Sequence, residues 1–132
     1  MKITADTNVL VRASVRDEPV QAVAAEKILR GASYIVISLP CLCEVVWVLR
    51  RFYHFDRATT AEAIQALISS RNVITNRVAA EAGLALLVAG GDFADGVIAH
   101  EGARLGGEIF VSFDRRAVAR LAEQEVRTMI PD

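Results

Sequence analysis

Four acidic residues stand at positions where an alternating α/β fold would bring them together. Asp6 directly follows a strand-like run at the N-terminus, residues 2–5, and Asp114 directly follows the apolar run 109–113. Glu44 and Asp95 fall in the first turns of two predicted helices. Carboxylate oxygens are the ligands that Mg²⁺ and Mn²⁺ prefer. The pattern predicts a divalent-metal site in which these four acids are the ligands.

Strands and helices alternate along the elements that must position the acids. The predicted strands are short apolar runs, and helix signals such as Pro19, Gly31 and Pro40 separate them. Such alternation predicts an α/β fold, a doubly wound parallel sheet of four or five strands with helices on both faces. The strands are expected at 2–5, 34–38, 72–75, 109–113 and 126–130, and the helices at 19–31, 40–53, 59–69, 77–88, 92–106 and 117–123.

Two of the predicted helices carry an apolar face that should turn toward the core. In the helix 19–31 this face consists of Val20, Ala24 and Ile28. Trp47 falls near the Glu44 side of the next helix, and we interpret it as a core residue, because a lone aromatic side chain is more often core than a base-stacking platform. The apolar face of that next helix consists of Leu42, Val45, Val46, Leu49, and Phe52 or Tyr53.

Strand order decides whether the acids meet. All strands of a parallel sheet point the same way, and ligands bind at their carboxyl edge, where the strand order reverses. In the order 3-2-1-4-5, the first and fourth strands are neighbours, so that Asp6 and Asp114 face each other. The helices that begin at the same edge bring Glu44 and Asp95 there.

A cluster of this kind is costly unless a cation compensates it. Two carboxylates about 5 Å apart repel each other by roughly 3 kcal/mol at an effective dielectric constant of 20. A helix N-terminus offsets only about 1 kcal/mol of this repulsion. The cluster therefore requires a bound cation or shifted pKa values.

Each acid also has a purely structural explanation. Asp114 can cap the helix that follows it. Asp92 and Asp95 have the spacing of a capping box. Asp6 can form a turn with its own backbone, and Glu44 can lie on a solvated helix face. The coincidence of four acids at one predicted edge favours the metal site over four independent structural roles.

Composition excludes several other classes of protein. The 132 residues fit a single domain, residues 1–132, and 53% of them are hydrophobic, which allows a core and argues against disorder. No apolar run is long enough to cross a membrane, and the N-terminus lacks a leader-like apolar segment, so we expect a cytoplasmic protein. The net charge of −1 provides no overall basic field for nucleic acid.

The remaining chemistry-bearing side chains offer no alternative site. Cys41 and Cys43, two positions apart on a predicted helix, point in different directions, and no further soft ligands exist for zinc. His54 and His100 have no convincing metal or nucleophile partner in the sequence. No glycine-rich phosphate-binding motif is present.

The residues around the four acids resemble those of PIN-domain ribonucleases, and specifically the VapC-type toxins of type II toxin–antitoxin pairs. The resemblance covers essentially the whole chain. It rests on four segments, 6–10, 38–44, 92–99 and 111–116, of which the first and third are the most specific.

This resemblance implies a Mg²⁺-dependent endoribonuclease, with Mn²⁺ as a possible substitute, which hydrolyses RNA phosphodiesters with the quartet of acids. It implies that Asn8 and Ser112 orient the carboxylates, whereas Asp92 is expected to cap its helix. It further implies a homodimer and a cognate VapB-type antitoxin as partner.

Candidate RNA contacts are the arginines Arg115, Arg116 and Arg51, any of which can also be a plain surface charge. Some family members carry a further acid shortly after the position of Asp114, where this chain has Arg115 and Arg116. The number of metal ions, one or two, therefore stays open.

Two alternatives come from other functional classes. A phosphate-accepting signalling domain also uses an acidic pocket at a sheet edge, but it needs a lysine after a late strand, and neither Lys2 nor Lys27 is placed there. A non-catalytic PIN-fold interaction module would have lost one or more of the acids, and all four are present.

Overall fold

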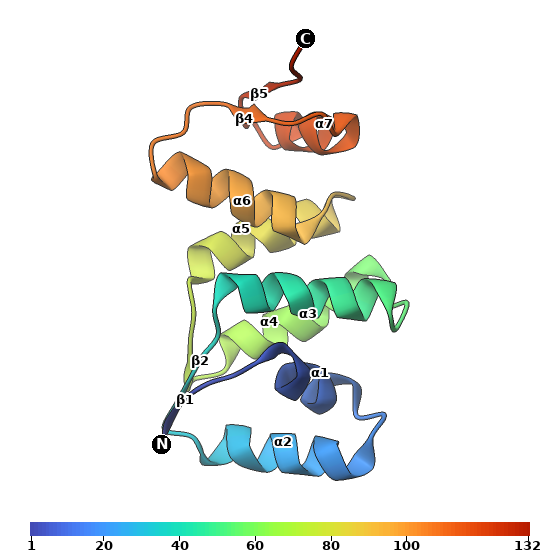
Figure 1. Ribbon diagram of the computed structural model, residues 1–132, viewed down its shortest axis with the longest axis vertical. Coiled ribbons are helices and arrows are strands. Elements are labelled where there is room, and N and C mark those ends of the chain that lie inside the picture. Colours follow the sequence, from blue (N-terminus) through green and yellow to red (C-terminus); the bar gives the residue numbers. More distant parts are fainter. The chain divides into compact units, whose positions relative to one another are not determined.

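The chain forms two units, Met1–Asn76 and Arg77–Asp132, in a computed structural model that describes residues 1–132. Unit 1 contains β1 (Lys2–Thr4), α1 (Thr7–Val15), α2 (Pro19–Gly31), β2 (Tyr34–Val36), α3 (Leu39–Arg51), α4 (Arg57–Ser69) and β3 (Val73–Ile74), labelled in Figure 1. Unit 2 contains α5 (Arg77–Val88), α6 (Phe93–Arg104), β4 (Phe110–Val111), α7 (Arg115–Glu123) and β5 (Thr128–Met129).

Both units are built on parallel strand pairs, as the alternating pattern predicts. In unit 1 the order is β1-β2-β3, with Ile3 opposite Ile35 and Ile35 opposite Val73. In unit 2, β4 pairs with β5, and Phe110 lies opposite Thr128. The parallel α/β architecture and the partial orders 3-2-1 and 4-5 are confirmed. The pairing of the first with the fourth strand would join the two units and stays a prediction.

Helix α1 is the element that the sequence analysis missed. Its nine residues include Val9, Val11 and Val15, whose β-branched side chains lower helix propensity. Only Leu10 and Val11 are buried, so the helix shows no long apolar stripe. Its start directly after Asp6 makes that acid an N-cap residue, which bears on the site below.

Helix α2 has the predicted bounds but packs with a different face. Its buried residues are Ala22 and Ala25, whereas Val20, Ala24 and Ile28 are exposed. The prediction of the apolar face was therefore wrong. The small alanine side chains let α2 approach α1 closely. The prediction chose the face with the larger apolar side chains, whereas the face that makes this contact carries the alanines.

Helix α3 fits its prediction closely. Ser38 accepts a hydrogen bond from the Cys41 backbone N–H at 3.3 Å, and a proline occupies the first turn. Leu42, Val45, Val46 and Leu49 are buried as expected. The end of the helix differs, because Phe52 is 71% exposed and Trp47, expected in the core, is 62% exposed.

Helices α5 and α6 pack through two glycines. A Cβ atom on Gly96 would lie 2.7 Å from the Ala82 carbonyl oxygen, and one on Gly83 would lie 2.7 Å from the Phe93 ring. Only a hydrogen side chain permits this approach. The close pairing fixes the first turns of α6, which carry Asp95.

Candidate functional site

In unit 1, Asp6 lies at the N-cap position of α1 with an extended backbone (φ −89°, ψ 164°). Its side chain makes no capping hydrogen bond, so the exposed carboxylate is not used by the helix that it precedes. Asp6 therefore occupies the N-cap position without a hydrogen bond from its side chain to the backbone of the helix. The carboxylate is available for another ligand.

Thr7 connects Asp6 to Glu44. The Thr7 hydroxyl donates a hydrogen bond to Glu44 Oε2 at 2.8 Å, and this bond joins the start of α1 to α3. Glu44 is exposed, as its structural explanation requires, but its carboxylate is held by this contact. Thr7 is not among the predicted site residues, although a hydroxyl directly after a candidate ligand is a signal for such a role.

Cys41 interacts with the charges of both Asp6 and Glu44, so these two acids lie near one another. Its Sγ donates to the Ala5 carbonyl oxygen at 3.5 Å and accepts from the Thr7 hydroxyl at 3.7 Å. Burial raises the pKa of the Cys41 thiol, and the nearby charges of Asp6 and Glu44 raise this pKa further. The hydrogen bond from Thr7 acts in the opposite direction and lowers the pKa. A raised pKa disfavours the thiolate, which is the form in which cysteine binds metal ions.

In unit 2, Asp95 is half-buried in the first turn of α6. Its burial raises the pKa of the carboxyl group, and the charges of Asp92 and Asp114 raise the pKa further. Asp95 therefore lies close enough to Asp92 and to Asp114 to be repelled by each of them. Perturbation by burial together with like charges is typical of functional sites.

The two neighbouring acids are helix caps. Asp92 accepts a hydrogen bond from the Ala94 N–H at 3.2 Å, as predicted. Asp114 Oδ1 accepts from the N–H groups of Arg116 at 3.0 Å and Ala117 at 3.1 Å. The capping explanation of Asp114 is confirmed, but both bonds use Oδ1, which leaves the second oxygen for a ligand.

Ser112 and Asn8, the two residues expected to orient the carboxylates, differ in their hydrogen bonds. Ser112 Oγ accepts a hydrogen bond from the Asp114 backbone N–H at 3.0 Å and so fixes the turn that presents this acid. Asn8 is exposed, and its side chain forms no hydrogen bond with Asp6 or Glu44. Its role in orienting a carboxylate stays a prediction.

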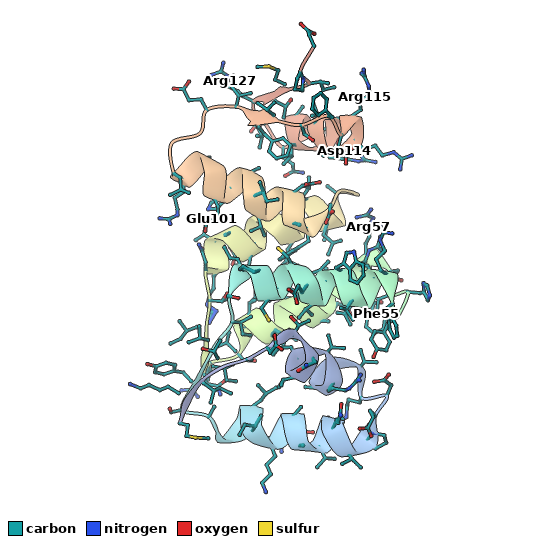
Figure 2. The ribbon with its side chains drawn as sticks, in the orientation of Figure 1. Phe55, Arg57, Glu101, Asp114, Arg115 and Arg127 are labelled. Carbon is teal, nitrogen blue, oxygen red and sulfur yellow. The ribbon has the colours of Figure 1, made fainter.

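The candidate RNA contacts are all exposed. Arg115 and Arg116 lie in the first turn of α7, and Arg51 is the last residue of α3. Figure 2 shows Asp114 and Arg115 at the start of α7. Positive side chains therefore adjoin the acids of unit 2, in a position to meet an anionic substrate.

The structure brings the acids together in two groups, Asp6 with Glu44 in unit 1 and Asp95 with Asp92 and Asp114 in unit 2. No group of three or more His, Cys, Asp or Glu side chains has a geometry that could hold a metal ion. The quartet combines residues of both units and stays a prediction.

Neither cysteine forms a disulfide bond. Of the two histidines, His54 is exposed and His100 is half-buried. None of the helices is long and apolar enough to span a membrane.

Comparison with protein families gives one result. The model of the PIN domain matches residues 3–124, a stretch that includes Asp6, Glu44, Asp95 and Asp114 and extends across both units. No curated protein matches the chain. The match covers nearly the whole sequence, and the chain therefore belongs to the PIN-domain family, whose members are generally nucleases that use divalent metal ions.

Proposed function

We propose that this protein is a Mg²⁺-dependent endoribonuclease that hydrolyses RNA phosphodiester bonds. The observation that carries the proposal is the half-buried Asp95, which accepts no hydrogen bond and lies beside the acids Asp92 and Asp114. A protein gains nothing in stability from such a group of like charges. A bound cation would offset the repulsion between these acids.

The donors fit magnesium or manganese. The proposed ligands are Asp6, whose carboxylate makes no cap, Asp95, the uncommitted oxygen of Asp114, and Glu44. All are hard oxygen ligands, and the nearest thiol, Cys41, stays protonated. When bound, such an ion supplies positive charge that stabilises the phosphoryl oxygens and makes a nearby water a better nucleophile.

The chain's own residues hold and orient the other participants. Thr7 fixes Glu44 through its hydrogen bond, and Ser112 fixes the turn of Asp114. Arg115 and Arg116 would hold the phosphate backbone of the RNA. Hydrolysis by water requires no covalent intermediate on the protein, and the products would carry a 5′-phosphate and a 3′-hydroxyl.

We further propose that the enzyme is the toxin of a VapBC-type pair. The support is the resemblance of the acid-bearing segments 6–10 and 92–99 to those toxins. A small VapB-type antitoxin would then be the partner that inhibits it, and the toxin itself would be a homodimer. Co-expression with the product of an adjacent gene, followed by co-purification, tests this part independently of the chemistry.

Cleavage of total RNA by the purified protein tests the proposed activity. We expect cleavage with Mg²⁺ or Mn²⁺, none with EDTA, and none from Asp95→Asn with Mg²⁺. Glu62→Gln removes an exposed acid of α4, outside both groups, and should cleave like the wild type. Equal inactivity of the wild type and Asp95→Asn on every RNA tested would favour a non-catalytic PIN-fold module instead.

A further inference from the structure

The outer face of α3 carries three exposed residues that the core does not use. Glu44, Trp47 and Arg51 are spaced at i, i+3 and i+7, so they share one face of the helix. Trp47 is 62% exposed. At a rise of 1.5 Å per residue, Arg51 lies about 10 Å along the helix axis from Glu44. We call these three residues the α3 stripe.

A second exposed ring lies at the Arg51 end of the stripe. Phe52 is 71% exposed, and its ring stands edge-on to that of Tyr53 with 5.1 Å between centroids. The next ring, Phe55, lies 6.4 Å from Tyr53. Figure 2 shows Phe55 in the turn between α3 and α4, and Arg57 at the start of α4.

Hydrogen bonds hold this turn in place. The Phe55 backbone N–H donates to the Leu49 carbonyl at 2.9 Å, and Arg50 Nη1 donates to the Phe55 carbonyl at 3.0 Å. The Tyr53 hydroxyl donates to Asp17 Oδ2 at 3.0 Å and accepts from Arg12 Nη1 at 3.1 Å. The rings therefore stand on a fixed turn and not on a loose loop.

Exposed aromatic rings beside arginines fit one kind of ligand well. Burying a large apolar side chain stabilises a protein by roughly 1.5–3 kcal/mol, and Trp47 and Phe52 forgo much of this. Bases of single-stranded nucleic acid stack on such rings, while arginine binds the phosphates between them. Arg51 is exposed and takes part in none of the ion pairs of the structure, so its charge is available to an anion.

We propose that the α3 stripe, together with Phe52, is a stacking platform for single-stranded RNA. The proposal rests on the proposed function for the kind of nucleic acid, and it assigns the nucleotides beside the scissile bond to this helix. Glu44 marks the catalytic end. The distance of about 10 Å to Arg51 corresponds to roughly three stacked nucleotides at 3.4 Å each.

The protein contains its own probe, because Trp47 is its only tryptophan. A short single-stranded RNA of mixed sequence is titrated into the protein in EDTA, so that binding is read without cleavage. We expect the RNA to quench Trp47 fluorescence. Independently labelled RNA should show a Kd that is roughly 5- to 150-fold weaker for Trp47→Ala, the loss of one base stack.

Two variants complete the experiment. Trp47→Phe keeps a ring and should retain most of the affinity. Val23→Ala, a truncation of an exposed apolar residue on α2, should bind like the wild type. Folding of each variant is checked by circular dichroism before titration.

The platform is overturned if RNA binds without quenching Trp47, or if Trp47→Ala binds as tightly as the wild type. It is equally overturned if light scattering shows a dimer that Trp47→Ala dissociates, since Trp47 would then be an interface residue. If Trp47→Ala cleaves RNA and binds it with an unaltered Kd, the stacking proposal is wrong and the proposed nuclease activity stands. If RNA quenches Trp47 but is never cleaved, the proposed nuclease activity is wrong and the stacking proposal stands.

Discussion

At the residue scale, the acids of the site differ in the hydrogen bonds that their carboxylates accept from the protein. Asp92 and Asp114 are engaged by backbone N–H groups at helix starts, and Glu44 by the Thr7 hydroxyl. Asp95 is half-buried without such a bond, and its pKa is raised by burial and by two neighbouring acids. The least satisfied carboxylate is thus the one that most needs a cation.

Asp95→Asn should raise the melting temperature in EDTA while it abolishes cleavage. Because the pKa of Asp95 is raised on folding, its stabilising contribution is fully present below the ordinary aspartate pKa and is lost as the pH rises through the raised value. At neutral pH the charged form therefore destabilises the fold, and the amide relieves this. Thermal melts at several pH values test it, since the gain should shrink as the pH falls. A lower melting temperature for the variant at neutral pH would contradict the argument.

Thr7→Val should lower kcat/KM by about 10-fold or more, because partners that orient a ligand typically matter to this extent. The substitution keeps the shape and removes the 2.8 Å bond to Glu44. Stability should change by less than about 1.5 kcal/mol, the net worth of an ordinary hydrogen bond. Thr7→Ser retains the hydroxyl and should retain the activity. Equal kinetics for the valine and serine variants would show that the bond has no positioning role.

At the element scale, helices could be predicted from the sequence where capping residues and prolines mark their starts. The starts of α2, α3 and α6 followed from Pro19, Pro40 and Asp92. Helix α1 did not, because its valines favour strands locally and tertiary packing overrides that preference. The exposed Trp47 was mistaken for core because sequence spacing gives a helix face but not what covers it.

Gly96→Ala should destabilise the protein by about 1–3 kcal/mol, the usual cost of overpacking, because its Cβ would meet the Ala82 carbonyl oxygen at 2.7 Å. Gly102→Ala, in the same helix with nothing within 4 Å of the new Cβ, should instead stabilise by up to about 1 kcal/mol. Urea denaturation measures both. If the two variants shifted stability alike, close contact between α5 and α6 would not be what fixes Asp95.

At the scale of the whole molecule, the PIN-domain match extends across both units, 3–124. The sequence could predict the parallel strand pairs within each unit, since short β-branched runs alternate with helices. It also singled out four acids by their places after expected strands or near expected helix starts, and their joint role as ligands stays a prediction. It could not supply Thr7 as the partner of Glu44, since that contact joins residues far apart in the chain.

The central proposal is that the predicted acids, among them the half-buried Asp95, bind a divalent cation. Calorimetric titration of Mg²⁺ into the wild type, Asp6→Asn, Asp95→Asn and Glu62→Gln tests it most directly. We predict binding to the wild type and to Glu62→Gln, with at least a 10-fold loss of affinity in each of the other two variants. A wild type that binds no ion, or an Asp6→Asn variant that binds Mg²⁺ as the wild type does, would contradict the account.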